Sequence, residues 1–315
     1  MVTLSDVAKK ANVSKMTVSR AINHPEKVTK ELKELVYVAM KELNYKPNLA
    51  AKALANNRTQ IIKVFILEEM DTTEPYYMNL LTGIANKLDE EYYSLQLVTR
   101  KNVNIGHSDG YIVCGARESD YETINNLEKP VVLFGENKHS FDYVDTKNQE
   151  GIGIATEYAL SLRYEHIVYI GIDVDEPFEM SRELGYRKAM SAALKKEYLY
   201  RFENRSRYTG RFIEENWSGF EKNTCFVCSS DRLAIGILRG IREKEGKVPE
   251  EFGIIGHDGV FLDQIAYPQL TTMKQSVMDM GALCAAMVLK KVRENGKPQG
   301  NILCDSQLIV RGTTR

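Results

Sequence analysis

The first 23 residues constrain this chain most, because their apolar residues recur at the spacing of two short amphipathic helices. A break at residues 11–13 separates these helices, and Thr3 with Asp6 three positions later forms a capping-box pattern. Ser14 is the expected N-cap of the second helix. Two short helices joined by a tight turn predict a helix-turn-helix, whose second helix enters the DNA major groove. An ordinary helical hairpin with a solvated face is the alternative that periodicity leaves open.

A third amphipathic helix is predicted at residues 30–43, and the proline at position 47 marks its end. Residues 1–46 are therefore expected to form a small all-α headpiece. Residues 47–59 would form a hinge and linker, in which residues 48–56 are long enough only for a marginal helix. A plain flexible linker is the alternative for this segment.

Charge separates the headpiece from the rest of the chain. Residues 1–58 contain eleven Lys and Arg against five Asp and Glu, although the 315-residue chain has a formal net charge of −1. A basic head on an acidic body favours a nucleic-acid contact confined to the head. The five cysteines are scattered among apolar residues, which predicts reduced thiols in a cytoplasmic protein. No signal peptide and no apolar run of about 18 residues is visible, so no membrane partner is expected.

From residue 61 onward, predicted strands and helices alternate, which indicates βαβ units and parallel sheets. Residues 142–145 are expected to begin a crossover between two such series. Two series of similar size predict an α/β core of two lobes, with a ligand between them at the carboxyl ends of the strands. The strands are expected at residues 61–67, 93–98, 110–114, 131–134, 166–170, 199–202, 225–228, 252–255 and 271–275, and the helices at 77–92, 151–162, 182–194, 209–216, 232–245 and 277–293.

Two segments carry a family resemblance: TLSDVAKKANVSKMTVSRAIN at 3–23 and YKPNLAAKALANNRT at 45–59. They resemble the headpiece and hinge of the lactose-repressor (LacI/GalR) family of bacterial transcription regulators. The resemblance implies a homodimer that binds double-stranded operator DNA, with a leucine at position 54 wedged into the minor groove. The implied DNA-binding residues are Thr3, Ser14, Lys15, Met16, Thr17, Ser19, Arg20, Asn23, Asn48, Ala51 and Leu54.

The same resemblance implies that residues 60–315 form a periplasmic-binding-protein-like core for effector binding and dimerisation. Lobe 1 would comprise about 60–145 and 277–304, and lobe 2 about 146–276 and 305–315. Only about eleven residues separate the strands at 93–98 and 110–114. The helix that the family usually places there is therefore predicted to be absent or reduced to a loop.

A saccharide site needs planar polar groups for adjacent hydroxyls and an aromatic wall for the C–H face. Residues 68–77 follow the first strand, so Glu74, Tyr76 and Tyr77 are expected to line the cleft. The family resemblance adds Glu136, Arg182 at a helix start, Ser230 and Asp258, whereas Asp231 is expected to be a helix N-cap. A solvated arginine is the alternative for Arg182. Residues 74–77, 172–177 and 311–315 resemble the branch that controls galactoside and galactose genes.

The sequence contains no recognisable catalytic set, phosphate-binding loop or metal-ligand spacing, so neither an enzyme nor a cofactor is expected. The hypothesis is an allosteric repressor of a sugar-utilisation operon, whose operator affinity is controlled by a saccharide such as galactose or a galactoside. The alternative is a saccharide-binding transport-type protein without a DNA function.

Overall fold

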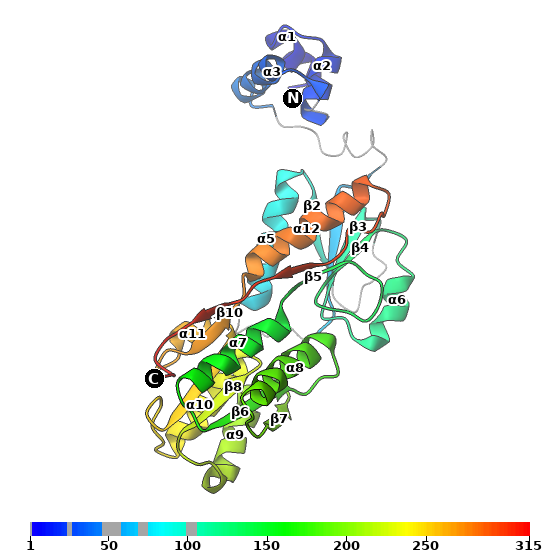
Figure 1. Ribbon diagram of the computed structural model, residues 1–315. Helices are drawn as coiled ribbons and strands as arrows, with labels where there is room; N and C mark the ends of the chain where they lie inside the picture. Colours follow the sequence, from blue (N-terminus) through cyan, green and yellow to red (C-terminus); the bar gives the residue numbers. More distant parts are fainter. Residues whose placement is uncertain (1, 24–26, 46–57, 69–74, 99–105) are drawn as a thin grey trace. The chain divides into compact units, whose positions relative to one another are not determined.

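The computed structural model describes residues 2–23, 27–45, 58–68, 75–98 and 106–315, and the chain divides into two compact units (Figure 1). Unit 1 is Met1–Thr59 and unit 2 is Gln60–Arg315. Several predictions fall outside the described residues: the hinge helix with Asn48, Ala51 and Leu54, the cleft residue Glu74, and most of the segment where a family helix was expected to be missing.

Unit 1 contains the three helices that the sequence predicts: α1 (Leu4–Lys10), α2 (Lys15–Asn23) and α3 (Lys30–Glu42). Their apolar faces meet in one small core, which buries Val7, Ala8, Ala11, Val18, Ala21, Val36 and Ala39. The predicted capping box is present, because the Thr3 hydroxyl accepts from the Asp6 amide and the Asp6 carboxylate accepts from the Thr3 amide. The Ser14 hydroxyl accepts from the Thr17 amide at 3.0 Å, as expected for the start of α2.

The first sheet of unit 2 is parallel throughout and has the strand order β11-β5-β4-β3-β1-β2. Helices α5 (Tyr76–Glu90) and α12 (Val277–Arg293) cover one face, and the short α6 (Tyr121–Asn125), preceded by a 3₁₀ turn at Glu118–Asp120, packs on the other. The six strands are β1 (Ile61–Ile66), β2 (Ser94–Val98), β3 (Gly110–Cys114), β4 (Val131–Phe134), β5 (Tyr143–Thr146) and β11 (Ile302–Cys304).

The second sheet has the order β12-β10-β9-β8-β6-β7 and is parallel except for the edge strand β12. Helices α7 (Asn148–Ser161) and α8 (Pro177–Ala192) cover one face, while α9 (Ser206–Asn216) and α10 (Asp231–Glu243) cover the other (Figure 1). The strands are β6 (His166–Ile172), β7 (Tyr198–Phe202), β8 (Thr224–Cys228), β9 (Phe252–Asp258), β10 (Thr271–Lys274) and β12 (Gln307–Ile309), with short helices at Trp217–Gly219 and α11 (Leu262–Ile265).

Two glycines let α5 and α12 lie directly against each other on the first sheet. A Cβ atom on Gly83 would lie 1.9 Å from the carbonyl oxygen of Met278. A Cβ atom on Gly281 would lie 2.3 Å from the carbonyl oxygen of Leu80. The contact between the two helices therefore requires glycine at both positions, because any residue with a Cβ atom would force the backbones apart.

The structure corrects two boundaries that matter for the cleft. Residues 142–145 were expected to begin a crossover, but Tyr143–Thr146 forms strand β5, paired with β4 and β11. A four-residue strand is too short to show a clear period in the sequence. Helix α8 begins at Pro177 rather than at Arg182, because proline is well suited to the first helical position. Arg182 therefore lies in the second turn of α8.

The chain passes between the two sheets three times: from β5 to α7, from β10 to α12, and from β11 to β12. Strands β11 and β12, helix α6 and helix α11 were not expected from the sequence. Each has five residues or fewer and takes its conformation from non-local neighbours. No helix in the described part of the chain is long and apolar enough to cross a membrane.

Candidate functional site

The exposed surface of α2 carries the side chains predicted to contact DNA bases. Lys15, Met16 and Arg20 are exposed, and the Met16 side chain is unusually so for an apolar residue, at 62%. Val18 and Ala21, on the opposite side of α2, are buried in the core of unit 1. The helix therefore presents a cationic and apolar surface while its inner face holds it in place.

The other predicted DNA-binding residues of unit 1 have partly structural roles. The Thr3 hydroxyl belongs to the α1 capping box, and the hydroxyls of Ser14 and Thr17 hydrogen-bond to each other at 2.9 Å. Ser19 is half-buried, and Asn23 is the last residue of α2. Hydroxyls and backbone amides at a helix start are suited to phosphate contacts, whereas longer side chains reach base edges.

Unit 2 contains a cavity of about 590 Å³ at the carboxyl ends of strands from both sheets. This position agrees with the prediction that a ligand site lies between two lobes. The first sheet and its connections contribute Glu68, Tyr76, Tyr77, Val113, Gly115, Ala116, Arg117, Tyr121, Leu133, Phe134, Gly135, Glu136 and Asp145. The second contributes Ile172, Asp173, Val174, Glu176, Phe178, Arg182, Glu203, Asn204, Arg205, Ser230, Arg232 and Asp258.

All the described residues that the sequence predicts for the effector site line this one cavity. These are Tyr76, Tyr77, Glu136, Arg182, Ser230 and Asp258. They come from five different segments, which are separated by up to about 180 residues along the chain. The cavity thus brings together carboxylates, a guanidinium and aromatic rings, the groups that a saccharide site requires.

Arg182 is a fixed, buried side chain, so the alternative of a solvated helix-start arginine is wrong. Its Nε donates to Asn148 Oδ1 at 2.8 Å, and its Nη1 donates to the carbonyl oxygen of Ser229 at 2.8 Å. The guanidinium also lies 5.0 Å from the centre of the Phe178 ring. These contacts hold the planar group in one orientation, which suits it to recognise adjacent hydroxyls.

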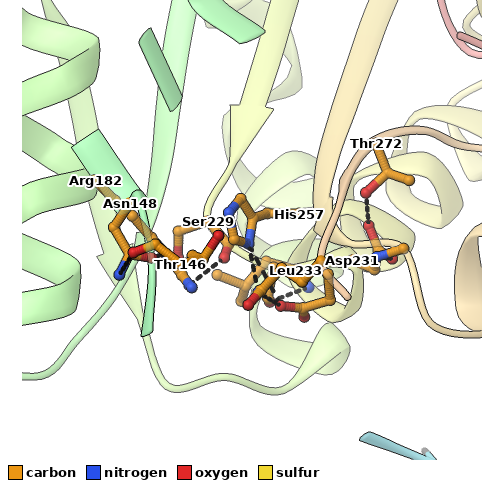
Figure 2. Close-up of polar contacts among 12 residues, drawn as sticks. Thr146, Asn148, Arg182, Ser229, Asp231, Leu233, His257 and Thr272 are labelled. Atoms are coloured by element: carbon orange, nitrogen blue, oxygen red, sulfur yellow. Dashed lines mark hydrogen bonds and ion pairs between the residues drawn. The ribbon is translucent and has the colours of Figure 1, made fainter. Parts of the chain in front are cut away.

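Asn148, which the sequence did not single out, connects the two sides of the cavity. Its Nδ2 donates to Glu136 Oε1 and Asp145 Oδ2, both at 3.1 Å, and to the carbonyl oxygen of Thr146 at 3.2 Å. Its Oδ1 accepts from Arg182, beside which it lies in Figure 2. Glu136 Oε2 also accepts from the Ser181 hydroxyl of α8 at 2.9 Å. Glu136, which follows β4, is therefore hydrogen-bonded to both α7 and α8 of the other lobe.

Asp145 is buried and Asp258 is largely buried, and the two carboxylates approach the cavity from opposite sheets. Burial raises the pKa of Asp145 to about 6, although hydrogen bonds from the Glu136 and Thr146 amides and the charge of Arg182 oppose the rise. Burial also raises the pKa of Asp258 to about 6, with Arg182 and Arg232 opposing. Burial disfavours the ionised form of both carboxyls, so a hydroxyl donor from a ligand would stabilise that form.

The backbone at Asp258 has a φ of 117°, which is uncommon for a residue other than glycine. Two buried side chains hold it there. Asp231 accepts from the Gly259 amide at 2.8 Å and from the Thr272 hydroxyl at 2.6 Å (Figure 2). Gln275 Nε2 donates to Asp258 Oδ1 at 2.9 Å. An unfavourable φ that is over-determined by its neighbours is typical of a binding residue.

The prediction that Asp231 is the N-cap of a helix is wrong, because Ser230 takes that position while it also lines the cavity. Ser230 is the N-cap of α10, and its hydroxyl accepts from the Leu233 amide at 3.2 Å and donates to Asn204 Oδ1 at 2.6 Å. Asp231 is the first helical residue, and its carboxylate supports the Asp258 loop. The pattern Ser-Ser-Asp contains three good capping residues in succession, and only the tertiary contacts of Asp231 with Gly259 and Thr272 decide among them.

An ion-pair network at the cavity was also missed from the sequence. Arg117 Nη2 lies 3.1 Å from Glu68 Oε2, and Arg117 Nη1 lies 3.5 Å from Glu176 Oε1. Glu68 and Arg117 follow β1 and β3, while Glu176 is the N-cap of α8. The sequence does show charged residues directly after strands. Which of them form ion pairs could not be predicted, because that depends on which strands are neighbours in the sheet.

Aromatic side chains supply the apolar part of the cavity wall. The rings of Tyr76 and Tyr77 are 5.7 Å apart in an edge-to-face arrangement, and Tyr76 lies 6.3 Å from Phe134. Phe178 contributes a further ring from α8. Aromatic faces of this kind stack against the C–H groups of a sugar ring.

Metal binding and thiol chemistry find no support in the described part of the chain. It holds no cluster of three or more His, Cys, Asp or Glu side chains arranged to bind a metal ion. Cys114, Cys225, Cys228 and Cys284 are buried, and burial raises the pKa of each thiol. These cysteines are packing residues rather than nucleophiles.

A helix-turn-helix unit joined to a two-lobed α/β unit with a polar cleft defines a class of bacterial transcription regulators, and comparison with known sequences agrees. Residues 3–48 match the family described as bacterial regulatory proteins, lacI family, and residues 156–314 match a periplasmic binding protein-like domain. The chain is 52% identical over 315 residues to the HTH-type transcriptional regulator YvdE of Bacillus subtilis (strain 168), with all of both chains covered. The chain belongs to the lacI family of transcriptional regulators.

More distant relatives carry similar descriptions. The HTH-type transcriptional regulator RegA of Clostridium saccharobutylicum is 28% identical, with 99% of this chain and 98% of that one covered. Among solved structures, a transcriptional regulator CelR–cellobiose complex superposes with a TM-score of 0.73 at 24% identity, covering 99% and 100% of the two chains. A lac repressor dimer bound to operator and the anti-inducer ONPF has the same TM-score at 21% identity, covering 99% of each chain. These structural likenesses support the fold.

Proposed function

We propose that this regulator is a sequence-specific repressor of a sugar-utilisation operon, and that a saccharide bound in the cavity controls its affinity for operator DNA. The observation that carries the proposal is the pairing of an exposed, cationic recognition helix with a cavity lined from two lobes. A transport-type binding protein has no use for the first of these units. Membership of a family of transcription regulators argues against that alternative as well.

The DNA-binding half of the proposal rests on α2. Lys15 and Arg20 would donate to guanine O6 and N7, and Met16 would contact apolar groups in the major groove. Backbone amides and hydroxyls near Thr3 and Ser14 would contact phosphates, together with Thr17, Ser19 and Asn23. From the sequence alone, Asn48, Ala51 and Leu54 are proposed to add contacts in the minor groove.

The effector half rests on the cavity. Arg182 would donate to one ligand hydroxyl, while Asp258 and Glu136 would accept from others. Tyr76 and Phe178 would stack against the ring. Because Ser230 uses its hydroxyl in the helix cap, its contact with a ligand would be secondary. Tyr77 and Glu74 are proposed to complete the wall.

Control of DNA binding would follow from linkage between the two sites. Residues on both sides of the cavity bind one ligand, so the ligand favours one arrangement of the lobes over another. A ligand changes DNA affinity only by its differential affinity for these arrangements. We propose that the regulator acts as a homodimer in the cytoplasm; the lac repressor in the operator complex is also a dimer. Exposed apolar side chains on unit 2, such as Met78, Met278, Ile265 and Tyr267, are suited to such an interface.

The test is a gel shift of the full chain on DNA from its own upstream region, with and without saccharides. Galactose and lactose represent the branch that the sequence resembles, and cellobiose is the ligand of the CelR complex. We expect a specific shift that at least one saccharide changes. If the chain binds no upstream sequence, the proposed DNA-binding function is refuted. If a specific shift is insensitive to every saccharide, the proposed control by a saccharide effector is refuted.

A further inference from the structure

The cavity wall is rich in negative charge. Seven carboxylates and four guanidinium groups line it, so formal negative charge exceeds positive charge by three. The carboxylates come from both lobes and therefore surround the cavity rather than marking one edge of it. They are Glu68, Glu136, Asp145, Asp173, Glu176 and Asp258, with Glu203 at the rim.

Three of the four arginines of this wall, Arg117, Arg182 and Arg232, have acceptors within the protein. Arg117 lies between the carboxylates of Glu68 and Glu176, through both terminal nitrogens. Arg182 donates to an amide and a carbonyl oxygen, and Arg232 Nη1 donates to the carbonyl oxygen of Asn204 at 3.4 Å. An anionic ligand would have to compete with these acceptors before it gained a charge-assisted hydrogen bond.

Helix N-termini are the other common anion sites, and here the protein fills them with its own acids. Helix α8 begins at the cavity with Glu176 at the N-cap and Glu179 in the first turn. Helix α10 begins there with Asp231, and the Ser230 hydroxyl caps the Leu233 amide. An anion at either helix start would therefore approach acidic side chains, and at α10 one of the free amides is already used by the Ser230 cap.

We propose that the effector is a saccharide that carries neither a phosphate nor a carboxylate group, and that the carboxylates of the cavity exclude anionic sugars. This inference rests on the proposed saccharide site and narrows its ligand class. Neutral hydroxyls donate hydrogen to Asp145, Asp258 and Glu136, whereas a ligand anion meets them with like charge in a poorly solvated space. An amino sugar satisfies the same acceptors.

The test uses matched ligands on one sugar skeleton with the full chain. Calorimetry would compare galactose, galactose 6-phosphate and galacturonate, and in parallel glucose, glucose 6-phosphate and glucuronate, with lactose and cellobiose as larger neutral ligands. We expect a neutral member to bind and its anionic counterparts to bind at least tenfold more weakly. An anionic sugar that binds as well as its neutral counterpart overturns this inference and leaves the saccharide site standing. If no sugar of either charge binds, the proposed saccharide site fails, and this inference fails with it.

A charge variant tests whether the exclusion is electrostatic. Glu203→Lys reverses an exposed charge at the rim, and Glu215→Lys makes the same change on α9 outside the cavity. We expect Glu203→Lys to narrow the neutral-to-anionic affinity ratio at least threefold and Glu215→Lys to leave it unchanged. An equal ratio in wild type and both variants would overturn the electrostatic explanation.

Discussion

Replacing Asp258 by Asn should stabilise the core while weakening saccharide binding. The side chain is 13% exposed and its ionised form is poorly solvated, which raises its pKa to about 6. Asparagine has the same shape and tolerates the positive φ at this position. Its Oδ1 can still accept from Gln275 Nε2, so the substitution removes charge with little change of packing.

The size of the effect follows from the two pKa values. Below the ordinary pKa of 3.8 both the folded and unfolded chains hold the proton, so burial of Asp258 is not penalised. As the pH rises through about 6, the folded protein must also ionise and this stability is lost. Two pKa units correspond to about 3 kcal/mol at most. Neighbouring charges respond to the change, because Arg182 and Arg232 lower the pKa of Asp258, and the Asp258 charge in turn raises the pKa of Asp231.

We therefore expect Asp258→Asn to raise the free energy of unfolding by about 2 kcal/mol at pH 8, or the Tm by roughly 4 °C. At pH 4 the gain should disappear, because the wild-type carboxyl is then protonated in the folded protein. The assay is thermal unfolding of both proteins at pH 4, 6 and 8. Asp173→Asn, which changes an exposed acid of the same cavity, is the matched control.

Two results would refute this reasoning. A stabilisation equal at pH 4 and pH 8 would show that the effect arises from packing rather than from ionisation. Destabilisation at pH 8 would mean that hydrogen bonds to the carboxylate outweigh its desolvation. Saccharide affinity measured on the same samples should fall in the variant, because Asn cannot supply a carboxylate acceptor.

Four further substitutions test other parts of the molecule. Arg20→Ala should cost roughly 1–3 kcal/mol of operator binding at one base pair if Arg20 is bidentate to guanine, measured by affinity for single-base operator variants. Arg182→Ala should weaken saccharide binding by more than tenfold in calorimetry while operator affinity is retained, because two charge-assisted hydrogen bonds fix its guanidinium. Ser230→Ala should lower the free energy of unfolding by about 1 kcal/mol in urea melts, because the α10 cap is lost. Leu54→Ala should retain the dimer and weak non-specific binding but lose specific affinity and most of the DNA bend, measured at one salt concentration.

Two matched variants serve as controls for Arg20→Ala and Arg182→Ala. Lys41→Ala is the control for Arg20→Ala, because it removes an exposed cation from α3 rather than from α2. Arg187→Ala is the control for Arg182→Ala, because it removes an arginine of α8 that pairs with Glu183 and Glu197 outside the cavity. Equal losses for Arg20→Ala on every operator variant would identify a phosphate contact instead. Normal saccharide affinity in Arg182→Ala would remove it from the site. An unchanged bend in Leu54→Ala would identify residues 48–56 as a linker.

The polar residues of the cavity show how much of the site can be predicted from family resemblance and from the positions of strand ends. Glu136, Arg182 and Asp258 were predicted because they match family positions or follow strands, and they line one cavity. Asn148 and Arg117 were missed because nothing local distinguishes them from other polar residues near helix starts. Their roles arise from contacts with residues 34 and 49 positions away.

The sequence by itself determined the local architecture. Helical spacing and capping residues fixed α1, α2 and α3, since both act within a few residues along the chain. Apolar runs fixed most strands, including Gly110–Cys114 and Val131–Phe134. Such signals are local because a strand or helix must bury its own apolar face whatever its neighbours are.

Only the tertiary structure decided which lobe-to-lobe contacts form and what charge the cavity presents. Strands β5, β11 and β12 are three or four residues long and become strands by pairing with partners distant in the chain. The ionisation of Asp258 and the engagement of Arg117 depend on burial and on partners from other strands. Solvation and Coulomb interactions act through space rather than along the chain, so no local pattern of residues encodes them.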